Sequence, residues 1–302
     1  MAAPVTHTTA CDTARDFLDC LRSSNPVWLP PNTIKSPWVF RGHGRADWKL
    51  TASARRQDGQ DKLMPLIDRI RPSLERSGWN PIDQEILTQL YAEHRAVVQF
   101  AEQADALGLR VPELDQLFEK RTINAFASTL GGRACRPSLA HAIAQHHGIP
   151  TCLLDFTYNG LIAAYFAAES ACRLMTGGTA SDTLAVWAVN YIALERGGKC
   201  GRVLCPKTES EYIHAQDGVF LFDVDASKYF REFKRWRAID EIELDSPTPN
   251  DPIRLITLPI EQAKEVLRLL WAEGVYKAKL MPTYDNVAEA VFRRLELDSE
   301  FD

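Results

Sequence analysis

The residue of this sequence with the clearest potential for chemistry is Arg41, in the segment WVFRGHG (38–44). It ends a run of β-branched and aromatic residues that is typical of a strand. An arginine presents a planar fork of donors that matches a phosphate or a carboxylate. The adjacent Gly42 and Gly44 are expected to let a ligand approach the backbone closely. The alternative is a buried arginine that pairs with an internal acid such as Asp155.

A second polar cluster opens the segment QHHGIPTCLLDFT (145–157). Gln145, His146 and His147 end a predicted helix, and Gly148 suits its C-terminal cap. Histidines in such a place favour capping or packing over metal binding, because the helix dipole alone makes them favourable there. No HExxH spacing occurs, so no zinc or other metal site is predicted.

Asp155 and Thr157 lie in the apolar part of the same segment, which predicts a buried strand. Asp155 is therefore expected to be a buried carboxylate, which is costly unless it is paired. Arg41 is the obvious partner. Thr157 follows two residues later, so its side chain shares a strand face with Asp155.

A third polar stretch, ESEYIHAQDGVF (209–220), precedes a turn and a strand, and a solvated loop is the alternative to a catalytic one. Its polar candidates are Glu209, Glu211, His214 and Gln216. The segment KYFREFKRWR (228–237) interleaves basic and aromatic residues. It predicts either a nucleic-acid contact or an amphipathic surface helix.

Composition narrows the class of protein. The 302 residues are 45% hydrophobic and 25% charged, as in ordinary globular proteins. A formal net charge of −5 gives no global attraction to nucleic acid or to an anionic membrane. The N-terminus lacks the pattern of a signal peptide and no apolar run is long enough to span a bilayer, so a cytoplasmic protein is expected. The seven scattered cysteines are expected to be reduced thiols.

The periodicity of apolar residues predicts the elements that position these side chains. Helices are expected over 12–22, through most of 60–147, over 161–175 and over 260–273, and Gly274 is expected to cap the last one. Strands are expected in the segments WVFRG, IPTCLLDFT, TLAVWAVNYIAL, VFLFDVD and DPIRLITLP. Pro72, Pro81 and Pro112 are expected at helix starts or breaks. The fold class is therefore α+β, a single domain over 1–302 with a mixed sheet core and a helical insertion at 60–147.

These motifs together resemble the FRG domain of bacteria and their phages. The marks of that family occur over roughly residues 12–295, as Phe40-Arg41-Gly42, Trp48 and Leu50, Arg55 or Arg56, the element from Gln145 to Thr157, Asn159, the Gln216-x-Gly218-x-Phe220 pattern, and a closing segment at 277–291. Two positions depart from the family, since Phe156 stands where tryptophan is frequent and His43 where glutamine is frequent.

A weaker similarity is to ADP-ribosyltransferases of the Arg-Ser-Glu type, in the order of three motifs. These enzymes place an Arg on an early strand, a Ser/Thr motif on a second strand that leads into an Ala-x-x-Phe-Ala helix, and a Glu before a later strand. The resemblance implies NAD as a substrate, with Arg41 holding its pyrophosphate or ribose, Thr157 orienting the nicotinamide ribose, and Glu211 or Gln216 bonding the ribose 2′-OH. It also implies a sheet core like that of ADP-ribosyltransferases.

The resulting hypothesis is an NAD-dependent transferase that modifies a protein or a nucleic acid, as a toxin or in phage defence, with a neutralising partner protein. The predicted catalytic residues are Thr157, Glu211 and Gln216, and the predicted NAD-binding residues are Arg41, Gly42, His43, Arg55, Gln145, His146 and Asp155. The alternatives are a non-catalytic module that binds a nucleotide or nucleic acid and a hydrolase that uses His146, His147 and Asp155.

Overall fold

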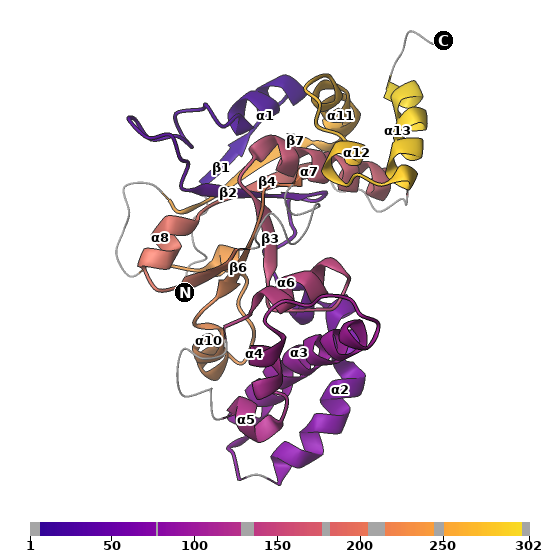
Figure 1. Ribbon diagram of the computed structural model, residues 1–302. Coiled ribbons are helices and arrows are strands. Elements are labelled where there is room, and N and C mark those ends of the chain that lie inside the picture. Colours follow the sequence, from indigo (N-terminus) through magenta and orange to yellow (C-terminus); the bar gives the residue numbers. More distant parts are fainter. Residues whose placement is uncertain are drawn as a thin grey trace.

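The structure, a computed structural model, describes residues 7–76, 78–127, 136–176, 182–204, 215–244 and 251–297 (Figure 1). The strands in these ranges form one mixed seven-stranded sheet in the order β1-β7-β4-β2-β3-β6-β5. They are β1 (His7–Ala10), β2 (Trp38–His43), β3 (Leu154–Thr157), β4 (Thr183–Asn190), β5 (Cys200–Val203), β6 (Gly218–Asp223) and β7 (Ile253–Pro259). Within this sheet β1 pairs with β7 in parallel, and the other neighbours are antiparallel. The predicted α+β class with a mixed sheet is confirmed.

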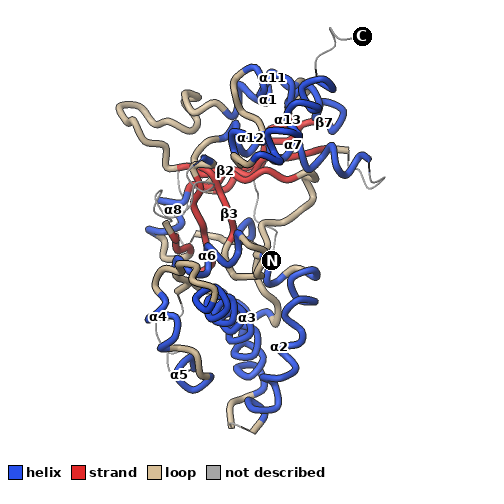
Figure 2. The backbone as a smooth tube through the Cα atoms, turned by 45° about the vertical axis from the view of Figure 1, so that its right-hand side comes forward, coloured by secondary structure: helices blue, strands red, loops and turns tan. Residues whose placement is uncertain are grey.

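The helices form two groups. Those that pack on the sheet or beside it are α1 (Ala14–Leu21), α7 (Gly160–Thr176), α8 (Tyr191–Arg196), α10 (Ala226–Phe233), α11 (Ala263–Ala272), α12 (Lys277–Leu280) and α13 (Tyr284–Leu297). Those of a helical lobe are α2 (Gln57–Glu75), α3 (Pro81–Ala106), α4 (Leu114–Glu119), α5 (Ile123–Ala127) and α6 (Leu139–His146). Figures 1 and 2 show this lobe beyond the end of the sheet where β3 lies, with the long helices α2 and α3 side by side.

The face of the sheet under α7 holds the closest packing between a helix and a strand. An ideal Cβ added to Gly42 of β2 would lie 2.0 Å from the carbonyl oxygen of Ala163 and 2.6 Å from the amide nitrogen of Ala167. The small residues of α7 therefore pack directly on β2. Gly42 thus serves this contact between backbones, whereas the sequence analysis expected it to admit a ligand.

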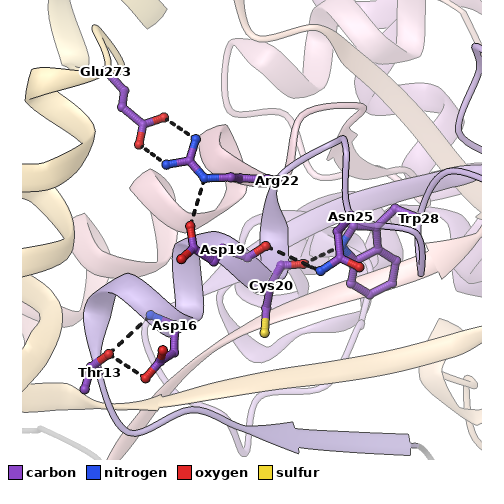
Figure 3. A network of polar contacts seen from close by, with 8 residues as sticks. All are labelled: Thr13, Asp16, Asp19, Cys20, Arg22, Asn25, Trp28 and Glu273. Carbon is purple, nitrogen blue, oxygen red and sulfur yellow. Dashed lines mark hydrogen bonds and ion pairs between the residues drawn. The ribbon is translucent and has the colours of Figure 1, made fainter.

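Helix α1 covers the neighbouring part of the same face. Thr13 caps it by accepting a hydrogen bond from the Asp16 amide, and Arg22 joins its end to Glu273 after α11 (Figure 3). Trp28 follows, donates from Nε1 to the Cys20 carbonyl, and packs edge-on against Phe40 at 5.2 Å between ring centroids. This layer buries the phenylalanine that precedes Arg41.

The sheet opens beside Arg41. Strand β2 pairs with β4 at six successive positions but with β3 only at Phe40 and Thr157. Beyond that pair the two strands separate, and Figure 1 shows β3 running away from β2 toward the helical lobe. A hydrogen-bond ladder that stops inside a sheet leaves backbone groups that need other partners.

Three predicted elements differ from the structure. The segment TLAVWAVNYIAL is not one strand, because the Asn190 side chain accepts a hydrogen bond from the Ala193 amide and begins α8. The strand of IPTCLLDFT starts only at Leu154, since the Thr151 backbone bonds Ser53 and Ala54 instead of a strand. Pro72 does not break a helix but lies within α2.

Other predictions for the elements are confirmed. Pro81 is the first residue of α3, and Gly148 and Gly274 have the positive φ angles, 87° and 75°, that suit residues just beyond a helix end. The strands β1 and β5 were not predicted. Helices α2–α6 occupy the range of the predicted insertion at 60–147, and the single domain over 1–302 stays a prediction.

We expect Gly42→Ala to destabilise the fold more than Gly78→Ala does. The new methyl at residue 42 collides with the backbone of α7, so we expect a loss of about 3 kcal/mol or more in the free energy of unfolding. Gly78 has φ of 78° and open space around it, so only backbone strain of about 1–2 kcal/mol applies there. Urea unfolding of both variants measures the difference, and equal losses would contradict the close helix–strand contact.

Candidate functional site

A cavity of about 390 Å³ lies where β2 and β3 separate. This volume falls within the range of small-molecule sites. Its walls come from β2, α6, β3, α7, β6 and the segment before α13. The lining residues are Phe40, Arg41, Gly42, Gln145, His146, Asp155, Phe156, Thr157, Ala163, Phe166, Gln216, Gly218, Val219, Phe220 and Met281. The cavity thus brings together Arg41, Gly42, Gln145, His146, Asp155, Thr157 and Gln216 from the predicted set.

Arg41 reaches across the opening between the two strands. Its Nη1 donates to the carbonyl oxygen of Asp155 at 2.8 Å and approaches the carboxylate Oδ2 of the same residue at 3.2 Å. The side chain is only 17% exposed. Its other terminal nitrogen, Nη2, makes no hydrogen bond to any residue that the structure describes. Arg41 Nη1 therefore bridges β2 and β3 where their backbone hydrogen bonds have stopped. The two N–H groups of Nη2 are left to donate to a ligand.

His43 orients the Arg41 guanidinium through a hydrogen bond on the side away from the cavity. Arg41 Nε donates to His43 Nε2 at 3.0 Å, so Nε2 must be an acceptor, and Nδ1 then carries the hydrogen that it donates to the Trp48 carbonyl at 3.2 Å. Burial and the charge of Arg41 lower the pKa of His43 to about 3, which keeps the ring neutral. His43 is buried and does not line the cavity, so the structure places this predicted NAD-binding residue in a positioning role.

Asp155 is held at the cavity by Gln145. The Gln145 amide nitrogen donates to Asp155 Oδ1, and its amide oxygen accepts from the Thr151 hydroxyl. The carboxylate is 59% exposed, so the expectation of a buried acid was wrong. The strand is apolar on the face that packs into the core with Leu154 and Phe156, whereas Asp155 points toward the opening.

Thr157, at the end of β3, and Gln216, just before β6, hold these two neighbouring strands together. The Thr157 hydroxyl donates to the Gln216 carbonyl at 2.7 Å and accepts from the Asn159 amide at 3.1 Å. The Gln216 side-chain nitrogen donates to the Leu280 carbonyl at 3.3 Å. These bonds link β3, the start of β6 and the end of α12. Thr157 therefore positions the cavity wall, and its hydroxyl proton is already engaged.

A second cavity of about 230 Å³ adjoins the first and shares Arg41, Gln145 and Asp155 with it. The rest of its wall comes from Ser53, from residues of the segment 148–154 and from the start of α2. The part at α2 contributes two cations, Arg56 and Lys62. Asp58 lies 3.7 Å from Arg56 and offsets part of that charge. The sequence analysis did not assign roles to Arg56 or Lys62, although the Arg55-Arg56 pair was the available signal.

Arg55 is not brought to either cavity. Its side chain is 5% exposed, lies 3.9 Å from Glu93, and stacks on Trp236 at 4.3 Å from the ring centroid. Arg55 and its neighbour therefore point in opposite directions, one into the helical lobe and one into the second cavity. The role predicted for Arg55 in NAD binding stays a prediction without geometric support.

Two further segments carried functional predictions, the polar stretch 209–220 and the basic segment 228–237. Glu209, Glu211 and His214 lie outside the described residues. In the basic segment 228–237, Arg231 pairs with Asp83, Arg235 with Glu241, and Arg237 with the buried Asp223. Because intramolecular acids offset these arginines, the segment offers less free charge for a nucleic-acid backbone than its composition indicated.

Within the described ranges, no three His, Cys, Asp or Glu residues are grouped as a metal site would require. No helix in those ranges combines the length and apolar character needed to cross a bilayer. None of the described cysteines Cys11, Cys20, Cys152, Cys172 and Cys200 is part of a disulfide bond.

Comparison with known proteins identifies one family. Residues 36–174 match the family model of the FRG domain, so the chain contains an FRG domain. The match includes Arg41, Gln145, Asp155 and Thr157, whereas Gln216 lies beyond it. No curated protein and no solved structure matches the chain.

We expect acid to destabilise the fold partly through His43. Its pKa of about 3 in the folded state lies below the unfolded value of about 6.5, so the unfolded chain binds the extra proton. The stabilisation is complete above pH 6.5 and falls by about 1.4 kcal/mol per pH unit below it. Measured between pH 4 and pH 6, the slope should be smaller by that amount in His43→Gln. The exposed His7→Gln serves as the control and should keep the wild-type slope.

We also expect Asp155→Asn to change the free energy of unfolding by less than about 1 kcal/mol, because an exposed ion pair contributes little. The Arg41 bond to the residue 155 carbonyl remains in this variant. Arg41→Ala should cost more, about 1–3 kcal/mol, since that carbonyl and His43 both lose a donor. Urea titration of both variants gives the comparison. A loss of 3–5 kcal/mol in Asp155→Asn would restore the buried-pair interpretation.

Proposed function

We propose that this FRG-domain protein is an NAD-dependent ADP-ribosyltransferase that modifies a protein or a nucleic acid. One observation carries the proposal. The three motifs that the resemblance to ADP-ribosyltransferases orders along the sequence belong to adjacent strands, β2, β3 and β6, and Arg41, Thr157 and Gln216 line one cavity. A sheet core like that of ADP-ribosyltransferases is part of the proposal.

The charge distribution supports a dinucleotide that spans both cavities. Arg41 stands between them and offers the two N–H groups of Nη2, which suit a pyrophosphate. Arg56 and Lys62 make the smaller cavity the cationic one, so the adenosine side of the pyrophosphate fits there. Asp155 repels an anion, but Gln145 binds its carboxylate on one side and Arg41 on the other.

The larger cavity suits the nicotinamide end. Phe166, Phe220 and Met281 supply apolar and aromatic walls for a planar ring, and the amides of Gln145 and Gln216 lie among them. Such a mixture of apolar surface and a few polar groups is typical of cofactor sites.

The proposed reaction needs little from the protein beyond positioning and electrostatics. The bond between ribose C1′ and the cationic nicotinamide nitrogen breaks, and its electron pair leaves with neutral nicotinamide. An oxocarbenium-like centre develops at C1′. A nucleophilic oxygen or nitrogen of the acceptor then bonds to C1′ and loses its proton to a base. Among the described lining residues of the larger cavity, Asp155 is the one carboxylate that can stabilise the positive centre or take the proton.

Glu211 remains the proposed catalytic acid of the third motif, and it lies outside the described residues. Gln216 is the described residue at the matching end of β6. A toxin or phage-defence role follows from modification of a macromolecule, and a neutralising partner protein is part of that proposal.

The second candidate function is binding without turnover. It is favoured by the hydrogen bonds that already engage the Thr157 hydroxyl and the Gln216 amide in holding the cavity wall. In that case the same two cavities recognise a nucleotide or the end of a nucleic acid.

The decisive experiment is to incubate the full chain with NAD labelled in its adenine and with candidate proteins and nucleic acids. We expect release of nicotinamide and label transfer, and both should fall at least about 100-fold in Arg41→Lys, because a lysine lacks the planar fork. Arg231→Lys on α10 is the matched control and should retain activity. Both variants should be folded at the assay temperature, which thermal melting checks.

The outcomes separate the two functions. If the wild type binds nucleotides but releases no nicotinamide with any acceptor, the binding module is the better description. If Arg41→Lys is as active as Arg231→Lys, then Arg41 is not part of the reactive site.

A further inference from the structure

The helical lobe contains a separate cavity of about 80 Å³ between α3, α4 and α6. None of its lining residues lines either of the two cavities beside Arg41. Its polar lining includes His94 and Glu93 from α3, Lys120 after α4, and Arg136 and His141 around the start of α6. The volume admits several water molecules or one small polar group.

His94 leaves a buried polar atom without a partner in this cavity. The residue is 6% exposed, and its Nε2 makes no hydrogen bond. The ring bonds the backbone carbonyls of Leu117 and Lys120, and because Nε2 is unpaired, Nδ1 makes these bonds and carries the hydrogen. Burial lowers the pKa of His94 to about 4, so the ring is neutral at pH 7. Nε2 therefore presents a bare lone pair, which is costly unless a donor meets it.

His141 presents the opposite group beside it. The two imidazole rings stack at 5.7 Å between centroids. His141 Nδ1 accepts from the Ser138 amide at 3.1 Å, so the hydrogen of the neutral ring sits on Nε2. Burial lowers the pKa of His141 to about 3, which keeps the ring neutral. The cavity thus combines one acceptor and one donor on neighbouring rings.

Two cations, Lys120 and Arg136, and one acid, Glu93, line the cavity around these rings. The Lys120 charge contributes to the lowered pKa values of both histidines, which places it near both rings. Arg136 is exposed and adds a second cation to the lining. Glu93 accepts from Gln89 at 2.9 Å and lies 3.9 Å from Arg55, so a cation outside the cavity offsets its charge.

We propose that this cavity binds an oxyanion that still carries a proton, namely hydrogen phosphate, either as the free ion or as a phosphomonoester that retains one. Its P–OH group donates to His94 Nε2. Its anionic oxygens accept from His141 Nε2–H, Lys120 and Arg136. Sulfate has the same shape and charge but no proton at neutral pH, so it leaves the His94 lone pair facing an oxygen lone pair.

Calorimetric titration of the full chain with inorganic phosphate, methyl phosphate and sulfate at pH 7 tests the proposal. We expect phosphate, or methyl phosphate, to bind at least tenfold more tightly than sulfate. Tighter binding of methyl phosphate identifies a phosphorylated molecule as the natural source, and tighter binding of inorganic phosphate identifies the free ion.

Variants locate the binding. Arg136→Gln changes an exposed residue and should weaken phosphate binding about tenfold, whereas Arg69→Gln, exposed on α2 of the same lobe, should not. His94→Phe keeps an aromatic ring against Phe126, whose centroid lies 5.0 Å away, and should abolish the preference for phosphate over sulfate. Equal affinity for phosphate and sulfate, no binding at millimolar phosphate, or an equal loss of binding in Arg69→Gln and Arg136→Gln would overturn the proposal.

Discussion

The structure around the cavities depends on one guanidinium that spans a gap between two strands. Arg41 donates across the opening to the Asp155 carbonyl, at the place where the ladder between β2 and β3 has stopped. A neutral His43 is required behind it, because a protonated ring could not accept from Arg41 Nε. The three residues of the Phe-Arg-Gly motif therefore have separate tasks. Phe40 packs under Trp28, Arg41 bridges the strands, and Gly42 admits the backbone of α7.

The parts of the fold that could be predicted are those with strong local signals. Pro81 at the start of α3, Gly148 after α6 and Gly274 after α11 act through neighbours in sequence, and each lies where the pattern placed it. The strand β1 is short, polar and mostly exposed, so no alternation of apolar residues reveals it. Helix α8 lay within an apolar run whose only break signal was Asn190, a residue that caps a helix through its side chain.

The sequence predicted the polar residues that line the larger cavity, but it did not predict how their side chains are arranged there. Local sequence could not show that Asp155 is exposed, since that depends on where β3 leaves β2. Nor could it distinguish Arg55 from Arg56. The turn of 3₁₀ helix at Ser53–Arg55 directs Arg55 toward Glu93, an acid that helix α3 buries some forty positions further along the chain, and leaves Arg56 at the second cavity. Both outcomes depend on contacts between distant segments.

The charges near Arg41 also constrain how an anion enters. Two unit charges 4 Å apart interact by about 4 kcal/mol at an effective dielectric constant of 20, so Asp155 opposes any phosphate placed beside it by an amount comparable to the attraction of Arg41. Solvent weakens both terms, because the Asp155 carboxylate is largely exposed. The balance is then decided by Arg56 and Lys62, which lie on one side of Arg41 only. An anion is therefore favoured toward the start of α2, which would direct the nicotinamide end of the proposed dinucleotide into the larger cavity between β2, β3 and β6. In the proposed function, this asymmetry of charge is what orients the dinucleotide, and no contact specific to its bases is needed for that.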